Sequence, residues 1–290
     1  SIIIVNWNVS SLLEKCLLSI FEQTKNIYFE VIVVDNSSSD GSRKMLMDFS
    51  SKQTNLQIIL NNTNNGFAKA NNQGAEIAKG RYFLFMNPDM ELLDDTGGKL
   101  VSFMDHRQDA AACVSQLIYP DGQRQNNIKR DPTFLSQAII LIKLHHFLKN
   151  FQPIRKYLAK DFDYATVQKV EQVMGAFIVI RKEIFNKVGG WSEDYWLWWE
   201  DVDLCQRLKN QGQSIYYTPI SRIIHHEGQS FTQKLSLQKQ KRFNKGMLIY
   251  FKKHHHFLAW LGLWLLQPAS LFLACLSQLL GIRPRPQGGL

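Results

Sequence analysis

The feature that most constrains the fold is the alternation of strand-like and helical segments over the first 90 residues. Mostly apolar runs occupy residues 2–5, 30–34, 56–60 and 81–86, and segments with helical patterning separate them. Strands without regular polar positions are buried on both faces, and a helix between successive strands favours parallel pairing. The sequence therefore predicts an α/β fold in which a doubly wound, mostly parallel sheet carries helices on both faces.

Polar residues follow these strands at the points where the strands end. They occupy residues 6–8, 35–40, 61–66 and 87–89. Parallel strands bring their carboxyl ends to one edge of a sheet, and ligands bind in such folds beyond that edge. We therefore expect the functional site along this edge.

Two aspartates at strand ends have distinct candidate roles. Asp35 ends the second strand, where its carboxylate could accept hydrogen bonds from a nucleobase or a ribose hydroxyl. The alternative is a turn whose side chains cap the next helix. Asp89 follows Asn87 and Pro88. Together with diphosphate oxygens it could hold Mg²⁺ or Mn²⁺, because hard cations prefer oxygen ligands; the alternative is an ordinary Asn-Pro-Asp turn.

A further pair of carboxylates, Glu200 and Asp201, follows the aromatic run at residues 196–199. Adjacent residues of a helix point in different directions, so we expect one of the two to face a cleft. Aromatic surroundings would raise its pKa toward that of a general base. The alternative is an acidic first turn that stabilises the helix dipole. His225, which ends another apolar run, could bind a metal or a phosphate, or could be an ordinary surface histidine.

The positive charge of the chain lies in its C-terminal part. The net charge is +9, and after Glu227 there are nine Lys and Arg residues and no acidic residue. Such a basic tail fits nucleic acid or an anionic membrane. Residues 257–282 then form a run of 26 residues without a charge. This continuation favours a membrane and argues against nucleic acid, for which an aromatic–basic groove pattern is also lacking.

The apolar run leaves several arrangements open. Gln267 and Pro268 interrupt it, so it could form a kinked span, a re-entrant hairpin or an interfacial helix, and a buried helix pair is the alternative to membrane contact. The four cysteines are scattered without metal-binding spacing, which argues against zinc and favours a reducing compartment. We predict one domain over residues 1–230 and a basic, apolar tail over residues 231–290.

Taken in order, the polar motifs of this chain resemble those of the family 2 glycosyltransferases, which are inverting enzymes of the GT-A fold. The likeness is greatest to the rhamnosyltransferase-like branch. The matching motifs occupy residues 4–8, 34–42, 64–74, 87–89, 174–177, 188–193, 200–207 and 225–230. They follow the order and spacing of the family over about residues 1–230.

The resemblance implies a role for each site residue. Residues 1–105 would form the nucleotide-binding half and residues 106–230 the acceptor and catalytic-base half. Asp201 would be the general base, with Glu200 beside it, and a divalent cation would be held by Asp89 and His225. The implied donor-binding residues are Asn6, Asn8, Asp35, Asn65, Asn71, Asn87 and Asp89.

The resemblance also implies a function. The protein would transfer a sugar, rhamnose or otherwise a hexose, from a dTDP- or UDP-linked donor to a glycan or lipid-linked saccharide of the cell envelope. It would work at the cytoplasmic face of a membrane, which its tail contacts. The alternatives are a protein or simple lipid acceptor, or a non-catalytic scaffold that binds sugar nucleotides or membranes. Two departures concern the site: Asn87 replaces an acidic residue, and Gln172 stands where relatives have Trp.

Overall fold

The four apolar runs of the N-terminal third form a parallel set of strands. The computed structural model of the protein describes residues 1–226 and 236–280. The strands are β1 (Ile2–Asn6), β2 (Val31–Asp35), β3 (Leu56–Leu60) and β4 (Tyr82–Met86), in the order β3-β2-β1-β4. Their register places Asn6 beside Asp35 at the ends of β1 and β2. The prediction of parallel strands in this region is confirmed.

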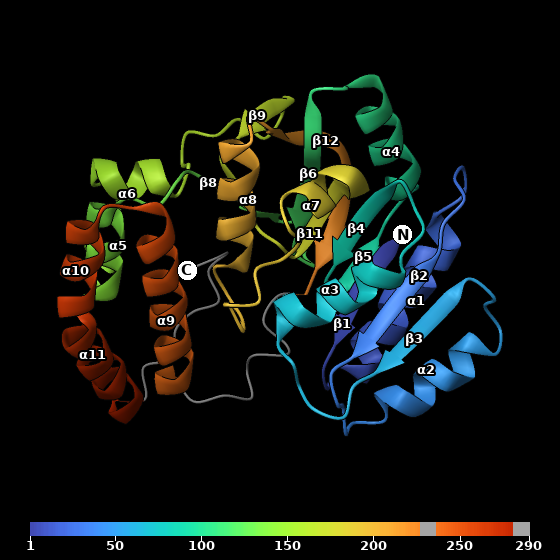
Figure 1. The fold of residues 1–290 in the computed structure, drawn as a ribbon, viewed down its shortest axis with the longest axis horizontal. Coiled ribbons are helices and arrows are strands. Elements are labelled where there is room, and N and C mark those ends of the chain that lie inside the picture. Colours follow the sequence, from blue (N-terminus) through green and yellow to red (C-terminus); the bar gives the residue numbers. More distant parts are fainter. Residues whose placement is uncertain (227–235, 281–290) are drawn as a thin grey trace.

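Helices cover both faces of the sheet (Figure 1). One face carries α1 (Ser10–Gln23), α2 (Ser42–Ser50) and α4 (Thr96–His106), and the other carries α3 (Phe67–Ile77), α7 (Lys182–Lys187) and α8 (Glu200–Asn210). Alternate strand residues serve the two faces: Ile2 and Ile4 belong to the core under α1, and Ile3 to the core under α3. A Cβ on Gly74 of α3 would lie 2.6 Å from Ile3 Cγ2, so this glycine permits the close packing.

The second half of the sheet is mixed. It contains β5 (Met90–Leu92), β6 (Ala110–Ile118), β11 (Phe177–Arg181) and β12 (Ser214–His225), and the full order is β3-β2-β1-β4-β11-β6-β12-β5. Strand β11 runs antiparallel to both β4 and β6, whereas β12 runs parallel to β6. Parallel contacts predominate along this path, as predicted. The short strands β7 (Arg124–Gln125) and β9 (Gln168–Val170) pair with β6 and β12, and β8 (Ile128–Lys129) pairs with β10 (Gln172–Val173).

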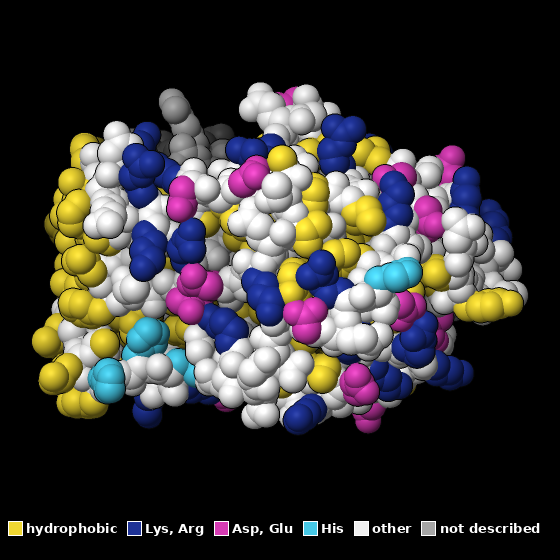
Figure 2. Space-filling model, turned by 90° about the horizontal axis from the view of Figure 1, so that it is seen from above, with side chains coloured by type: hydrophobic (Ala, Val, Ile, Leu, Met, Phe, Trp, Pro, Cys, Tyr) yellow, Lys and Arg dark blue, Asp and Glu magenta, His cyan; other side chains and the backbone are white. Residues whose placement is uncertain are grey.

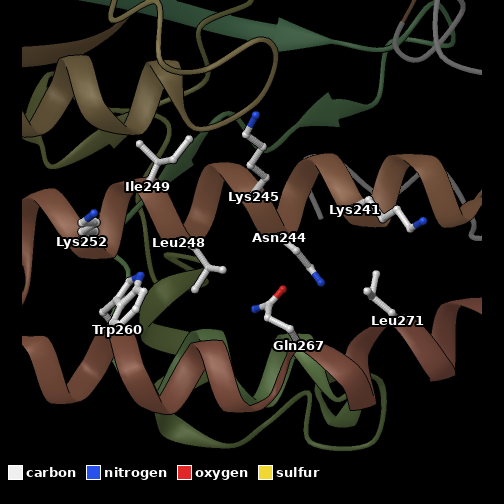
Figure 3. A pocket seen from close by; sticks show the side chains of 9 residues that line it. All are labelled: Lys241, Asn244, Lys245, Leu248, Ile249, Lys252, Trp260, Gln267 and Leu271. Atoms are coloured by element: carbon white, nitrogen blue, oxygen red, sulfur yellow. The ribbon is translucent and has the colours of Figure 1, made fainter.

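The C-terminal helices pack at one end of the molecule (Figure 1). They are α9 (Ser236–His254), α10 (Phe257–Leu265) and α11 (Gln267–Leu279), and α10 and α11 contact α5 (Phe134–Leu141) from the middle of the chain. Next to α5 lie η1 (Leu144–His146) and α6 (Gln152–Tyr157). Between α9 and the α10–α11 pair runs an open groove, with side chains of α9 on one side and Trp260, Gln267 and Leu271 on the other (Figure 3).

The proposed division of the chain at residue 230 stays a prediction. Residues 227–230 of the last motif, Lys234, Arg283 and Arg285 lie outside the described residues. Helix α9 packs against α8, and side chains of both helices share one apolar cluster with Tyr195 and Trp199. The first tail helix therefore adjoins the segment that carries the candidate base.

Candidate functional site

The carboxyl ends of six strands meet at one edge of the sheet. Strands β1, β2, β3, β4, β6 and β12 point the same way, because β11 is antiparallel to both of its neighbours. The amino end of β11 lies at the same edge. The candidate residues at these ends are Asn6, Asp35, Asn87, Asp89 and His225, with Gly175 just before β11. The structure therefore brings these candidate residues to one edge of the sheet, and their roles stay predictions.

Asp35 is buried and its carboxylate is held by three donors. Oδ2 accepts a hydrogen bond from Asn6 Nδ2 at 2.9 Å, and Oδ1 accepts from Ser38 N and Arg43 Nε, both at 3.0 Å. The Arg43 contact is an ion pair. Asn6 Oδ1 is also buried, yet it has no hydrogen-bond partner among the described residues. A ligand N–H is the kind of donor that such an acceptor needs.

Three other asparagines of the predicted donor site make local contacts. Asn8 has a left-handed backbone (φ 55°), and its Oδ1 accepts a hydrogen bond from Ser39 N at 2.7 Å. Asn71 Nδ2 donates to Phe67 O within α3, and Asn65 Oδ1 accepts from Thr63 Oγ1. These contacts shape the loops at this edge, and a direct role of the three residues in donor binding stays a prediction.

Asn36, which the sequence did not single out, connects three loops of the nucleotide-binding half, residues 1–105, which we call the donor half. Its N–H donates to Asn6 O at 2.8 Å, and its Nδ2 donates to Gly66 O at 3.0 Å. Its Oδ1 accepts a hydrogen bond from Asn61 Nδ2 at 2.9 Å. Its position within the polar tract at residues 35–40 was the available signal. The loops after β1, β2 and β3 are thus fixed to one another before any ligand binds.

Asp89 and His225 face each other across the end of the sheet. His225 Nε2 lies 3.5 Å from Asp89 Oδ1, which is buried and accepts no hydrogen bond from the described residues. His225 Nδ1 lies 2.7 Å from Gln125 Oε1, so a proton on Nδ1 would leave the lone pair of Nε2 facing the carboxylate. Two acceptors that face each other fit a shared cation. No sequence signal had pointed to Gln125.

The two protein ligands would not enclose a metal ion by themselves. Among residues 1–226 and 236–280, no group of three or more His, Cys, Asp and Glu side chains is arranged to hold a metal. Asn87 occupies a position where an acid would add a ligand, and its backbone N–H donates to Ala176 O at 2.8 Å. A cation here would need further oxygen ligands, which a diphosphate supplies.

Asp201 lies in the first turn of α8 and is bound to the backbone before β11. Its Oδ2 accepts a hydrogen bond from Gly175 N at 3.0 Å, and its Oδ1 accepts from Val202 N at 2.8 Å. A Cβ on Gly175 would lie 2.9 Å from Asp201 Cβ, so only glycine fits there. Burial raises the pKa of Asp201, and the two backbone N–H groups oppose that rise. The result is a carboxyl poised to take up a proton.

Glu200 is more completely buried than Asp201. Its Oε2 has no hydrogen-bond partner in the described part of the chain. Burial, and then the charge of Asp201, raise the pKa of Glu200 well above its ordinary value. The adjacent carboxyl groups are therefore not equivalent, and Asp201 is the one that hydrogen bonds help to keep ionised.

The aromatic run before α8 has a strained backbone. Trp198 (φ 66°) and Trp199 (φ 74°) both lie in the left-handed region, which bulky residues rarely adopt. The run also contacts the donor half: Phe67 N donates to Trp196 O at 2.9 Å, and a Cβ on Gly66 would lie 2.6 Å from the same oxygen. We call residues 196–203, which include the aromatic run and Asp201, the base segment. These contacts join it to the loop that follows β3.

Helix α9 supports the aromatic run from the other side. A Cβ on Gly246 would lie 2.9 Å from Trp199 Cδ1 and 3.0 Å from Trp198 O. The guanidinium carbon of Arg242 lies 3.7 Å from the centre of the Trp196 ring, a cation–π contact. Sequence reasoning missed this role, because it treated residues 231–290 only as a membrane-associating tail.

Asp203, two residues after Asp201, ties α8 to α9. Its buried carboxylate contacts Arg207 Nε at 2.6 Å, His254 Nε2 at 2.8 Å and Tyr195 OH at 3.1 Å. Burial raises the pKa of Asp203, but the His254 hydrogen bond and the Arg207 charge lower it more, so the net shift is downward. Asp203 is therefore an ionised anchor between the two helices.

The departure at Gln172 also lies near the base segment. Gln172 belongs to β10, which packs against α8, and its buried Oε1 has no hydrogen-bond partner among the residues described. A buried amide that lacks a partner marks a place where a polar ligand group could bind.

Two protein-family models match this chain and together cover most of it. The model described as "Glycosyl transferase family 2" matches residues 1–189, and "Glycosyl transferase family group 2" matches residues 145–283. Among solved structures, a mannosyltransferase from Pyrobaculum calidifontis in complex with GDP-Man and Mn²⁺ is similar with a TM-score of 0.59 and 16% identity. The similarity covers 98% of this chain and 76% of that one.

Curated relatives include proteins of different lengths. The O-antigen biosynthesis protein RfbC of Myxococcus xanthus is 25% identical over 79% of this chain, which spans only 17% of that protein. An L-rhamnosyltransferase of Mycobacterium tuberculosis, named for N-acetylglucosaminyl-diphospho-decaprenol, is 23% identical over 79% of this chain and 76% of its own length. Rhamnosyltransferase WbbL of Escherichia coli is 24% identical over 71% of this chain and 77% of its own length.

Proposed function

Because this chain belongs to glycosyl transferase family 2, we propose that it is an inverting glycosyltransferase that uses a nucleoside-diphosphate sugar. The observation that carries the proposal is the placement of Asp201 at the same edge of the sheet as Asp89, His225 and the polar loops of the donor half. A base, a cation site and a nucleotide site are the three parts that such a transfer needs.

The proposed donor is bound by the β1–β3 edge. Asn6 Oδ1 is a buried acceptor without a partner in the described ranges, next to the fixed carboxylate of Asp35. These groups suit the N–H of a pyrimidine base or a ribose hydroxyl. Two relatives are named as rhamnosyltransferases, so dTDP-rhamnose is the first donor to test and UDP-hexoses are the second.

The divalent cation, Mg²⁺ or Mn²⁺, would be held by Asp89 and His225. Bound there with the donor diphosphate, it would offset negative charge on the leaving group. Similar structures that contain Mn²⁺ are consistent with this assignment. The buried Asp89 Oδ1, which no described donor satisfies, fits such a ligand role.

Asp201 would act as the general base of a single displacement. An acceptor hydroxyl oxygen attacks the anomeric carbon, its proton passes to Asp201, and the bond to the diphosphate breaks with its electron pair on the departing nucleoside diphosphate. The attack from the opposite side inverts the anomeric configuration. Glu200, whose pKa is raised well above its ordinary value by burial and by the charge of Asp201, would lie beside the base.

The proposed acceptor is a saccharide of the cell envelope, glycan or lipid-linked, at the cytoplasmic face of a membrane. The names of the relatives, which refer to O-antigen and to a diphospho-decaprenol saccharide, support this class. The uncharged C-terminal helices support membrane contact, because Phe257–Leu279 is long and apolar enough to cross a bilayer.

The experiment is a donor assay with purified protein. Release of nucleoside diphosphate from dTDP-rhamnose, UDP-hexoses and GDP-mannose is measured with Mn²⁺ or Mg²⁺ and with a lipid-linked saccharide as acceptor. We expect release from one donor class that depends on the metal and the acceptor, and a product of inverted configuration by NMR. A retained configuration would contradict the assignment of Asp201, and turnover of no donor would favour a binding scaffold.

A further inference from the structure

Two segments more than 100 residues apart form one exposed apolar surface. The first is residues 134–151, which contain α5 and η1, and the second is residues 257–280, which contain α10 and α11. They touch directly, since a Cβ on Gly262 of α10 would lie 2.6 Å from Phe134 of α5. Figure 2 shows hydrophobic side chains gathered at the end of the molecule where Figure 1 places these helices. We call this surface the apolar end face.

The apolar end face consists of large side chains that point away from the core. The exposed ones are Phe134, Leu135, Leu144, Phe147, Leu148, Phe151, Phe257, Leu258, Trp264, Leu265, Phe272, Leu276, Leu279 and Leu280. Phe147 in the first segment is 85% exposed, and Phe272 in the second is 67% exposed. Only 17% of the most apolar window of Phe257–Leu279 is buried, which excludes the buried helix pair that the sequence left open. Surfaces of this kind mark contact with a protein or a membrane.

The charged residues near the apolar end face indicate which kind of partner it binds. Residues 132–160 contain five Lys and Arg residues, and residues 236–280 contain six, with no Asp or Glu in either segment. Lys241, Lys245 and Lys252 of α9 line the groove beside α10 and α11 (Figure 3). An apolar surface with aromatic residues, in segments whose charged residues are all basic, is complementary to the interface of an anionic bilayer.

The packing of α9 argues against a transmembrane arrangement of α10 and α11. Helix α9 contacts both of them and carries all six Lys and Arg residues found in residues 236–280. If α10–α11 crossed the bilayer, α9 would enter the hydrocarbon with these charges, which is strongly unfavourable. Phe257–Leu279 as a whole is long enough to cross a bilayer, so this argument depends on the charges of α9 and not on helix length.

We propose that the apolar end face is a monotopic binding surface for an anionic membrane, in which residues 134–151 insert beside α10 and α11 without crossing the bilayer. The inference deepens the proposed membrane association and rests on it. Because Asp203 and Gly246 connect α8 to α9, this arrangement also fixes the distance of the candidate base from the lipid surface.

The test is flotation of the full chain with vesicles of phosphatidylcholine alone or with phosphatidylglycerol. The variants are Phe147→Ser in the first segment and Phe272→Ser in the second, and the control is Tyr28→Ser, which removes an exposed aromatic side chain outside the apolar end face. We expect each of the first two to weaken binding to anionic vesicles about tenfold, because each removes a large buried apolar contact with lipid. Tyr28→Ser should bind as the wild type does.

Charge and depth are tested separately. Replacing Lys241, Lys245 and Lys252 by Gln should remove most of the preference for anionic vesicles. A membrane-impermeant maleimide added outside sealed vesicles should label Gly288→Cys in a Cys275→Ser background, because a monotopic arrangement leaves the whole chain on one side of the bilayer. Protection of this cysteine until detergent is added would overturn the monotopic arrangement and indicate a span.

The remaining outcomes distinguish this inference from the proposed function. If the wild type floats and Phe147→Ser floats equally, residues 134–151 are not part of the surface and the inference is wrong. If the wild type does not float but still binds a nucleoside diphosphate, membrane association fails while the transferase proposal stands. If light scattering shows a dimer that Phe147→Ser dissociates and the wild type does not float, the face joins two copies of the chain instead.

Discussion

The donor half and the base segment of the candidate site differ in what holds them in shape. In the donor half, the carboxylate of Asp35 is satisfied by three donors, and Asn36 fixes the neighbouring loops with ordinary hydrogen bonds. In the base segment, two consecutive tryptophans have positive φ, and Glu200 is buried with an oxygen that nothing in the described residues satisfies. The donor half is thus preorganised by local structure, whereas the base segment is held in an unfavourable state by packing from α9.

The largest effect is expected at the centre of the base segment. Asp201→Asn removes the proton acceptor but keeps the shape of the side chain. Transfer should fall by about 10²–10⁴-fold, the range for loss of a general base. Nucleotide affinity, measured by calorimetry, should stay within twofold of the wild type, because the donor half is unchanged.

The matched control for this variant is Asp48→Asn, at an exposed position on α2. It should leave transfer unchanged. If Asp201→Asn lost nucleotide binding as well as transfer, Asp201 would be a ligand of the donor or a structural residue, and the separation of the two regions would be broken.

The next effect is expected in the donor half. Asp35→Asn leaves the guanidinium of Arg43 without its charge partner and puts an N–H where an acceptor is needed. The free energy of unfolding should fall by about 1–3 kcal/mol, and nucleotide affinity should fall with it. Urea unfolding and calorimetry measure the two quantities. A stable Asp35→Asn that binds nucleotide normally would show that this carboxylate is only part of a turn and does not bind the donor.

The role of α9 is tested by Gly246→Val. The new side chain would collide with Trp198 and Trp199, so α9 must shift or the tryptophans must relax. Overpacking of this kind costs about 1–3 kcal/mol. Transfer should fall about tenfold while nucleotide affinity is retained. Gln238→Val, at an exposed position of the same helix, controls for helix propensity and should leave transfer unchanged.

The smallest effect concerns the pH dependence of stability. Because the folded-state pKa of Glu200 is raised, the folded protein binds more protons than the unfolded chain between the ordinary carboxyl pKa and the raised one. Wild-type stability therefore falls as pH rises through this window, and Glu200→Gln should show a smaller fall, because only the raised pKa of Asp201 remains. Urea unfolding should show a relative gain for the variant on the order of 1 kcal/mol between pH 5 and 8. The control Glu14→Gln, exposed on α1, should follow the wild type.

The donor half could be predicted from the sequence better than the base segment could. Strands β1–β4 and the polar residues that end them were predictable, because short apolar runs and helices alternate regularly there. The position of Asp201 beside Gly175 and the support of Trp199 by Gly246 were not, because each depends on residues 26 or more positions apart. Gln125, which lies 100 residues from His225, gave no local signal at all.

The C-terminal segment shows what composition alone leaves out. Its charge and hydropathy correctly indicated an apolar helical run broken near Pro268. They could not indicate that residues 134–151 complete the same surface, since that contact exists only in the folded protein. Nor could they show that α9 belongs to the support of the base segment.

The most direct test of the account is calorimetric binding of dTDP, UDP and GDP to the wild type, Asp89→Asn and Asp201→Asn, each with Mn²⁺ and with EDTA. The account predicts that the wild type and Asp201→Asn bind one nucleotide class with equal affinity in Mn²⁺ and lose that binding in EDTA. Asp89→Asn should bind this nucleotide no more tightly in Mn²⁺ than in EDTA. Equal binding with and without metal in all three proteins would contradict the cation site at Asp89 and His225. Binding of no nucleotide by the wild type would contradict the donor site itself.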